Sequence, residues 1–130
     1  MKALIFRETG EPNGVLKMAE IPPPPLAPGE ALVRVLLSPI NPSDLHMVRG
    51  RYGYQPELPA SPGAEGVGIV EAVGLGVQGS LVGTRVVFVH MWNTWREQIV
   101  CPPTFSYTLG TRGCEQLCSG EKSSGHENRS

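Results

Sequence analysis

The chain has 130 residues, and its 11 lysines and arginines against 12 aspartates and glutamates give a formal net charge of −1. This length predicts one domain, and the near-neutral charge excludes the basic footprint that nucleic acids and anionic membranes attract. The apolar runs are too short to cross a bilayer, and we see no signal or transit peptide. Three cysteines confined to the last third do not form a disulfide framework. We therefore expect a cytoplasmic protein with no nucleic-acid and no membrane partner.

The first half of the chain contains short strand patterns separated by turn residues. We predict strands over residues 2–7 and 15–20 with a turn at 10–14 between them, followed by an extended connector through the prolines at 22–25. The strongest strand pattern covers residues 30–37, where large aliphatic side chains surround one arginine.

A helix start follows this strand. Asn41 is a favourable N-cap, Pro42 suits the first helical position, and Asp44 favours the positive end of a helix. We predict a short helix over residues 42–49, which ends at Gly50 because glycine is a common helix stop.

The rest of the domain also shows strand patterns. We predict a proline-containing loop over 51–62 and strands over 66–74, 85–90 and 95–100. The sum is six or seven strands and one short helix, which indicates a mainly β, barrel-like fold within residues 1–103.

The last segment, residues 104–130, has a different composition. Residues 111–130 contain one large aliphatic residue, Leu117, among glycine, serine and charged residues. Such a composition buries too little apolar surface to offset the loss of chain entropy, so we interpret the segment as a polar and disordered tail.

One Gly-x-Gly-x-x-Gly pattern occurs, at Gly74, Gly76 and Gly79. A dinucleotide site needs this pattern to lead from a strand directly into a helix, whose amino end faces the pyrophosphate. Here the next residues lead into another predicted strand. We therefore interpret the pattern as a turn between two strands.

The metal-ligand residue types are scattered. His46, His90 and Cys101 are far apart in sequence, and Cys114 and Cys118 stand in the tail with only His126 nearby. Because structural zinc takes four ligands at tight spacing, we predict no metal site.

The stretch with the most information runs from Ile40 to Gly74 and includes Asn41-Pro42-Ser43-Asp44, Gly50-Arg51-Tyr52-Gly53 and Pro62-Gly63-Ala64-Glu65-Gly66-Val67-Gly68. Together with residues 1–3, 28–35, 82–87 and 94–97, it resembles the catalytic domain of the medium-chain dehydrogenases/reductases in order and spacing. The most similar branches are the quinone oxidoreductases and the trans-2-enoyl thioester reductases. The resemblance covers residues 1–103 and implies a GroES-like, partly open β-barrel.

The resemblance also implies an absence of zinc. Zinc-dependent members carry a cysteine where this chain has Asn41 and a histidine where it has Ala64. Glu65 alone cannot complete a catalytic zinc site, which usually takes three protein ligands.

The activity implied by the resemblance is NADPH-dependent reduction of an activated C=C bond, in a quinone or an enoyl thioester. Tyr52 matches the tyrosine that enoyl reductases use as proton donor, and the alternative is a loop tyrosine that shields the barrel, as Tyr54 could. Asn41 matches a residue of the nicotinamide pocket, and the alternative is helix capping alone. Trp95 and Arg96 are expected to border the substrate cleft, and the alternative for Trp95 is the barrel core.

The members of the resembled family are more than twice as long and continue into a Rossmann domain that binds NADPH. Because the resemblance fades after Pro103, we expect a truncated or frame-disrupted relative. Three functions stay open: a reductase that needs a dinucleotide domain, a catalytically silent barrel fragment, and a binding module. In the last case the exposed interdomain surface would drive self-association, since interfaces between domains bury roughly 600–1,500 Å².

Overall fold

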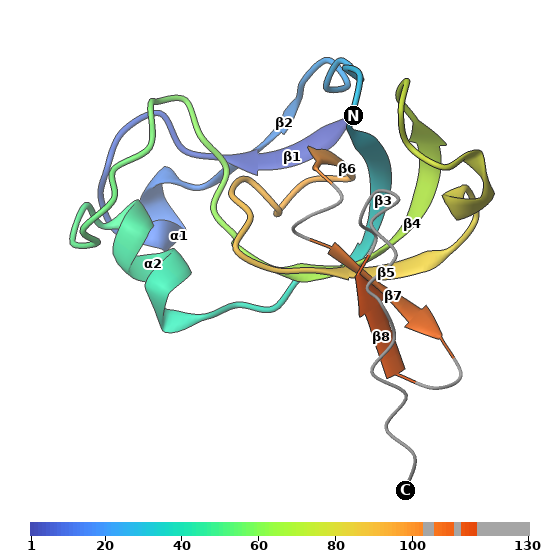
Figure 1. Cartoon of the computed structure of the whole chain (residues 1–130). Coiled ribbons are helices and arrows are strands. Elements are labelled where there is room, and N and C mark those ends of the chain that lie inside the picture. Colours follow the sequence, from blue (N-terminus) through green and yellow to red (C-terminus); the bar gives the residue numbers. More distant parts are fainter. Residues whose placement is uncertain (103–105, 111–112, 117–130) are drawn as a thin grey trace, which may run out of the picture.

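A computed structural model of the chain describes residues 1–102, 106–110 and 113–116 (Figure 1). The elements in chain order are β1 (Lys2–Ile5), α1 (Pro12–Val15), β2 (Lys17–Glu20), β3 (Ala31–Leu37), α2 (Pro42–Val48), β4 (Gly66–Val73), the 3-10 turn η1 (Gly79–Leu81), β5 (Arg85–Phe88), β6 (Gln98–Cys101), β7 (Ser106–Gly110) and β8 (Gly113–Gln116). Over these ranges, no helix has the length and apolar character needed to span a membrane.

The strands form two antiparallel sheets. One has six strands in the order β6-β3-β4-β5-β7-β8, and the other pairs β1 with β2. Neither sheet closes on itself, and both α-helices lie together at one side of the molecule (left in Figure 1). The prediction of a mainly β, partly open GroES-like fold is confirmed.

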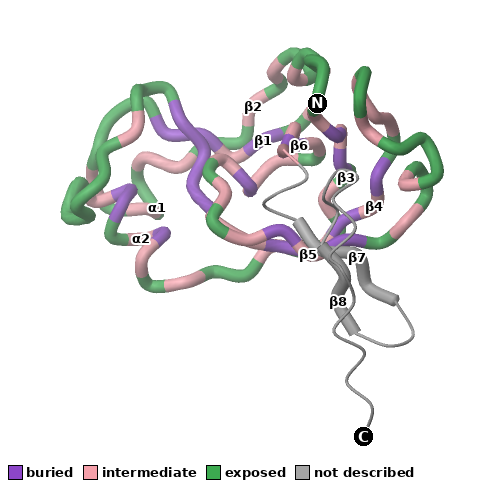
Figure 2. Tube along the Cα trace, in the orientation of Figure 1, coloured by how far each residue is buried: buried purple, intermediate pink, exposed green. Residues whose placement is uncertain are grey.

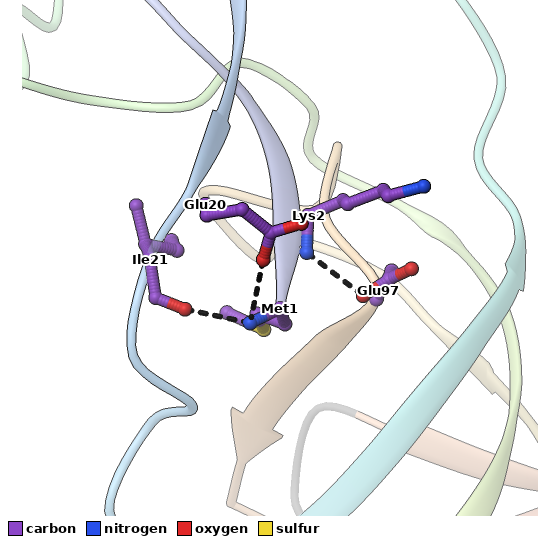
Figure 3. A network of polar contacts seen from close by, with 5 residues as sticks. All are labelled: Met1, Lys2, Glu20, Ile21 and Glu97. Carbon is purple, nitrogen blue, oxygen red and sulfur yellow. Dashed lines mark hydrogen bonds and ion pairs between the residues drawn. The ribbon is translucent and has the colours of Figure 1, made fainter.

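The two sheets are joined where β1 meets the segment just before β6. The Leu4 N–H donates to the Trp95 carbonyl at 3.0 Å, and the Glu97 N–H donates to the Lys2 carbonyl at 3.0 Å. Figure 3 shows that the Lys2 N–H in turn donates to Glu97 Oε2, at 2.8 Å. The terminal ammonium of Met1 donates to the Ile21 carbonyl at 2.7 Å, which ties the start of β1 to the end of β2.

Several element boundaries differ from the prediction, and three of the differences have a local cause. Residues 12–15 form a single helical turn that overlaps the predicted turn and the start of the next predicted strand, because Pro12 suits a first helical position and its carbonyl accepts the Leu16 N–H. The strand predicted over 85–90 ends at Phe88, since His90 has φ 54°, which lies outside the β region. The strand predicted over 95–100 begins only at Gln98, because residues 95–97 bond to β1.

The core consists of two clusters of buried residues. Figure 2 colours buried residues purple along the chain trace. The larger one lies on the six-stranded sheet and includes Val33, Val70, Val86, Phe88 and Ile99. The smaller one joins α2 to the end of β1 through Phe6, Met47, Val48 and Ala60. This second cluster fixes α2 against the rest of the domain.

Two strands lie within the segment predicted to be a disordered tail. β7 pairs with β5, with Val87 opposite Tyr107, and β8 pairs with β7. An open sheet edge offers backbone hydrogen-bond partners even to a polar segment. The prediction of disorder considered only the low apolar content of the segment and did not include this contribution. Residues 103–105, 111–112 and 117–130 lie outside the described residues, so a domain boundary at 103 and disorder over the rest stay predictions.

The Gly-x-Gly-x-x-Gly pattern lies between two antiparallel strands, β4 and β5. Gly74 and Gly76 belong to the turn after β4, and Gly79 begins the three-residue η1. Gly76 adopts φ 85°, which favours glycine. The interpretation of this pattern as a turn is confirmed.

Candidate functional site

The pairing of β3 with β4 brings Asn41 and Glu65 together. In this antiparallel pair Leu37 lies opposite Val67, so the chain leaves β3 and enters β4 at the same end of the sheet. The Asn41 side-chain amide donates to Glu65 Oε1 at 3.0 Å. Two residues 24 positions apart therefore form one polar site at the sheet end.

Asn41 also begins α2. Its backbone is extended, with φ −94° and ψ 151°, and its carbonyl accepts the Asp44 N–H at 3.0 Å. The Asp44 carboxylate returns a bond by accepting the Asn41 N–H at 2.8 Å. The capping position predicted for Asn41 is thus present, and its side-chain amide is turned to Glu65 at the same time.

Asp44 is a buried carboxylate, with 2% of the residue exposed. Burial raises its pKa above the ordinary aspartate value, the Asn41 N–H bond opposes this rise, and the charge of Glu65 adds to it. A hydrogen bond from the Gly63 backbone also lowers the pKa. The site therefore holds two neighbouring carboxylates, one buried, with an asparagine bonded to both residues.

The loop before β4 is fixed by two hydroxyl groups. Ser38 Oγ donates to the Glu65 carbonyl at 2.8 Å and lies 2.9 Å from the buried Thr94 hydroxyl. Gly63 has φ 101°, and a Cβ atom there would overlap the Thr94 hydroxyl and the Trp95 ring. Only glycine fits at this point, so the backbone beside Asp44 and Glu65 is held in one conformation.

Tyr52 belongs to an aromatic cluster at the other end of α2. Trp92 stacks on Tyr54 at a ring separation of 4.7 Å and meets the edge of Tyr52 at 6.3 Å. Tyr52 is 38% exposed, and within the described residues its hydroxyl makes no hydrogen bond. Asn41 precedes α2 and Tyr52 follows it, so a helix about 10 Å long lies between them in the chain.

Trp95 and Arg96 line a cavity of about 450 Å³ that neither Tyr52 nor Asn41 lines. The Trp95 indole N–H donates to the Pro39 carbonyl at 3.2 Å. Arg96 donates through Nη2 to Ser61 Oγ at 3.0 Å. Both residues therefore line a cavity, and their place at a substrate cleft stays a prediction.

No group of three or more histidine, cysteine, aspartate or glutamate side chains suited to a metal is found in the part of the chain that the structure describes. Ala64, next to Glu65, adds no ligand to the site. Cys118 and His126 lie outside the described residues, so a protein without zinc stays a prediction.

Asp44 was expected only as a favourable first-turn acid, and Glu65 was considered only as an incomplete zinc ligand. The signal that joins them is the pair of strand patterns at 30–37 and 66–74. Read as antiparallel neighbours, these patterns place residues 38–44 and 63–65 at one sheet end.

Comparison with known proteins identifies relatives of this chain. The sequence profile described as the alcohol dehydrogenase GroES-like domain matches residues 27–126. The mitochondrial enoyl-acyl-carrier-protein reductase of Bos taurus is 39% identical over 101 residues, which are 77% of this chain and 27% of that protein. An alcohol dehydrogenase of Geobacillus stearothermophilus is 32% identical over 126 residues, covering 97% of this chain and 34% of that protein.

Solved structures of related oxidoreductases share the fold of this chain. An NADPH:quinone reductase from Bacillus thuringiensis superimposes with a TM-score of 0.79 at 39% identity, over 85% of this chain and 33% of that chain. The Escherichia coli quinone oxidoreductase, solved with NADPH, has a TM-score of 0.78 at 28% identity, over 86% of this chain and 34% of that chain. The chain thus spans about a quarter to a third of these relatives.

Proposed function

The chain belongs to the alcohol dehydrogenase GroES-like domain family of the medium-chain dehydrogenases/reductases, and from this membership we propose that it is the catalytic-domain portion of an NADPH-dependent oxidoreductase. The substrate we propose is an activated C=C bond in an enoyl thioester, or a quinone. The observation that carries this proposal is the match to enzymes of both kinds, an enoyl reductase and quinone reductases, at 39% identity.

In this proposal Tyr52 is the proton donor. Reduction of a C=C bond adds a hydride at one carbon and a proton at the other, and bound NADPH supplies the hydride. A phenol hydroxyl can donate a proton to the developing carbanion. The 38% exposure of Tyr52 and the contact of its ring with Trp92 support this role, because the residue is partly open to solvent while its ring has a fixed neighbour.

Asn41 is our proposal for a cofactor contact. One amide N–H of Asn41 is used by Glu65, and an amide group carries two. The second N–H suits a carbonyl acceptor such as the carboxamide of nicotinamide. The described residues do not offer a strand-to-helix glycine loop for the pyrophosphate, so we assign them the nicotinamide end only.

The experiment uses a chimera in which this chain, up to Val100, is joined to the remaining part of the Bacillus thuringiensis relative. NADPH oxidation is followed with a trans-2-enoyl thioester and with a quinone. Tyr52→Phe removes only the hydroxyl, so kcat with the thioester should fall about 10²–10⁴-fold while NADPH affinity barely changes.

Tyr54→Phe is the matched control, because its ring also contacts Trp92. Equal and small losses in both variants would show that the tyrosines only pack the loop. A large effect on the quinone without one on the thioester would also contradict the role of Tyr52, since a quinone does not need a carbon acid.

A binding module is the second candidate, and exposed apolar side chains favour it. Leu37 at the end of β3 and Ile40 three residues later are 71% and 70% exposed. Such surfaces mark interaction sites when they cluster. A chimera inactive with both substrates, together with concentration-dependent self-association of this chain in size-exclusion chromatography, would favour the module over the reductase. Inactivity without association would indicate a silent fragment.

A further inference from the structure

The cavity beside Trp95 is an open apolar groove. It lies between β1 and β2 on one side and the end of β3 on the other, and its volume of about 450 Å³ is in the range of small-molecule sites. Met18, Leu37 and Ile40 line it and are between 64% and 71% exposed. These side chains offer a hydrocarbon surface that water covers poorly.

Arg96, one of the lining residues, has no counter-ion among the described residues. Arg96 Nε is buried without a hydrogen-bond partner, and Nη2 bonds only to a neutral hydroxyl, that of Ser61. Among the described residues no carboxylate lies within ion-pair distance of Arg96. Burial also lowers the pKa of Arg96, which shows that the surroundings penalise its positive charge.

The other charges that line the groove do not neutralise Arg96. They are Lys2 and Glu97, one of each sign, and the Glu97 carboxylate accepts the Lys2 backbone N–H at 2.8 Å. The lining residues therefore carry a net charge of +1. A partly desolvated cation gains most from one anionic partner.

We propose that this groove binds a long-chain carboxylate, whose alkyl chain lies on Met18, Leu37 and Ile40 and whose head group binds Arg96. A single carboxylate matches both the net charge of the lining and the planar fork of a guanidinium. The groove includes neither Tyr52 nor Asn41. The proposal therefore goes beyond the reductase function, and either can fail without the other.

Titration calorimetry of the 130-residue chain with octanoate, decanoate and dodecanoate tests the hydrocarbon part. Each methylene that leaves water should raise the affinity by about fourfold. Dodecanol has the same chain without the charge, and acetate has the charge without the chain. Both should bind at least about tenfold more weakly than dodecanoate.

Arg96→Gln tests the head-group contact. It should weaken dodecanoate binding at least about tenfold and leave dodecanol unaffected. Arg85→Gln is the matched control, because Arg85 is an exposed residue of β5 that does not line the groove. Leu37→Ser tests the apolar wall at an exposed position, and it should weaken both ligands.

Circular dichroism verifies that each variant is folded, and Leu37→Ser still tests the groove if Arg96→Gln does not fold. Equal affinities in the Arg96→Gln and Arg85→Gln proteins would overturn the proposal, as would equal affinities for dodecanoate and dodecanol. Absence of dodecanoate binding would overturn it outright. Tighter binding of dodecyl phosphate than of dodecanoate would overturn the choice of a carboxylate.

Discussion

The Asp44 carboxylate is buried, with 2% of the residue exposed, and it lies close to the charge of Glu65. Because burial raises its pKa in the folded state, the folded protein binds this proton more readily than the unfolded chain does. The free energy of unfolding should therefore fall as the pH rises from the ordinary value of 3.8 to the raised value.

Asp44→Asn removes this titration and keeps an oxygen that can accept the Asn41 N–H. The stability of the variant relative to the wild type should increase across that window by up to about 1.4 kcal/mol per pH unit. Urea unfolding at a series of pH values measures it. Glu8→Gln, at an exposed position, is the control for the loss of one carboxylate. A pH-independent difference for Asp44→Asn would contradict the linkage.

We also predict that the purified protein contains no stoichiometric zinc, since Asn41 and Ala64 stand at the two ligand positions. Elemental analysis after dialysis against a chelator measures this directly. The double variant Asn41→Cys, Ala64→His is the positive control, because Asn41 contacts Glu65, the neighbour of Ala64, across the sheet end. One zinc per wild-type chain would show that other ligands make a site.

Only part of the surroundings of Asn41 can be predicted from the sequence. Its N-cap position follows from local residue types, and the structure confirms it. Its bond to Glu65 depends on the register of β3 and β4, which shifts between Leu32 and Val33 and again after Val35. Such irregularities arise from packing over the whole sheet and leave no sequence signal of their own.

At the scale of elements, β4 depends on a residue without a side chain. A Cβ atom at Gly66 would lie 2.5 Å from the Leu37 carbonyl oxygen and 2.6 Å from the Phe88 ring. Both neighbours belong to the sheet, and Phe88 is fully buried. Close approach of β3, β4 and β5 at this end is thus possible only with glycine.

Gly66→Ala should accordingly lower the free energy of unfolding by about 1–3 kcal/mol, as overpacking does in cores. Denaturant titration measures this loss. Gly14→Ala is the control, since a Cβ there meets nothing within 4 Å and alanine favours the helical α1. It should be neutral or slightly stabilising. A similar effect at both positions would contradict the steric argument.

Local sequence patterns predict α2 but not α1. The start and stop of α2 are encoded by Asn41, Pro42 and Gly50, and the structure has them in place, with Gly50 at φ 75°. α1 includes a glycine and an asparagine and was predicted as a turn. Its last residue, Val15, packs on the cluster around Phe6, so a contact distant in sequence stabilises a helical turn that local propensity does not favour.

At the scale of the whole molecule, we predict that this chain alone binds NADPH weakly or not at all. Over the described residues the glycine pattern connects two antiparallel strands, so no helix terminus faces a pyrophosphate. Fluorescence titration of NADPH should give no saturation in the submicromolar range. The chimera described above is the positive control, and a submicromolar dissociation constant for the chain alone would refute the prediction.

The junction between the two sheets has a consequence for biosynthesis. β1 pairs early with β2, but Lys2 also bonds to Glu97 across 95 residues and Leu4 bonds to Trp95, so this second set of partners, in a segment near the end of the domain, is made only late in synthesis. A ribosome adding about 5–20 residues per second makes the emerging amino terminus wait roughly 5–20 seconds for that segment. During this interval the apolar side chains of β1 are exposed on the nascent chain, which makes them a natural binding site for chaperones that act during translation.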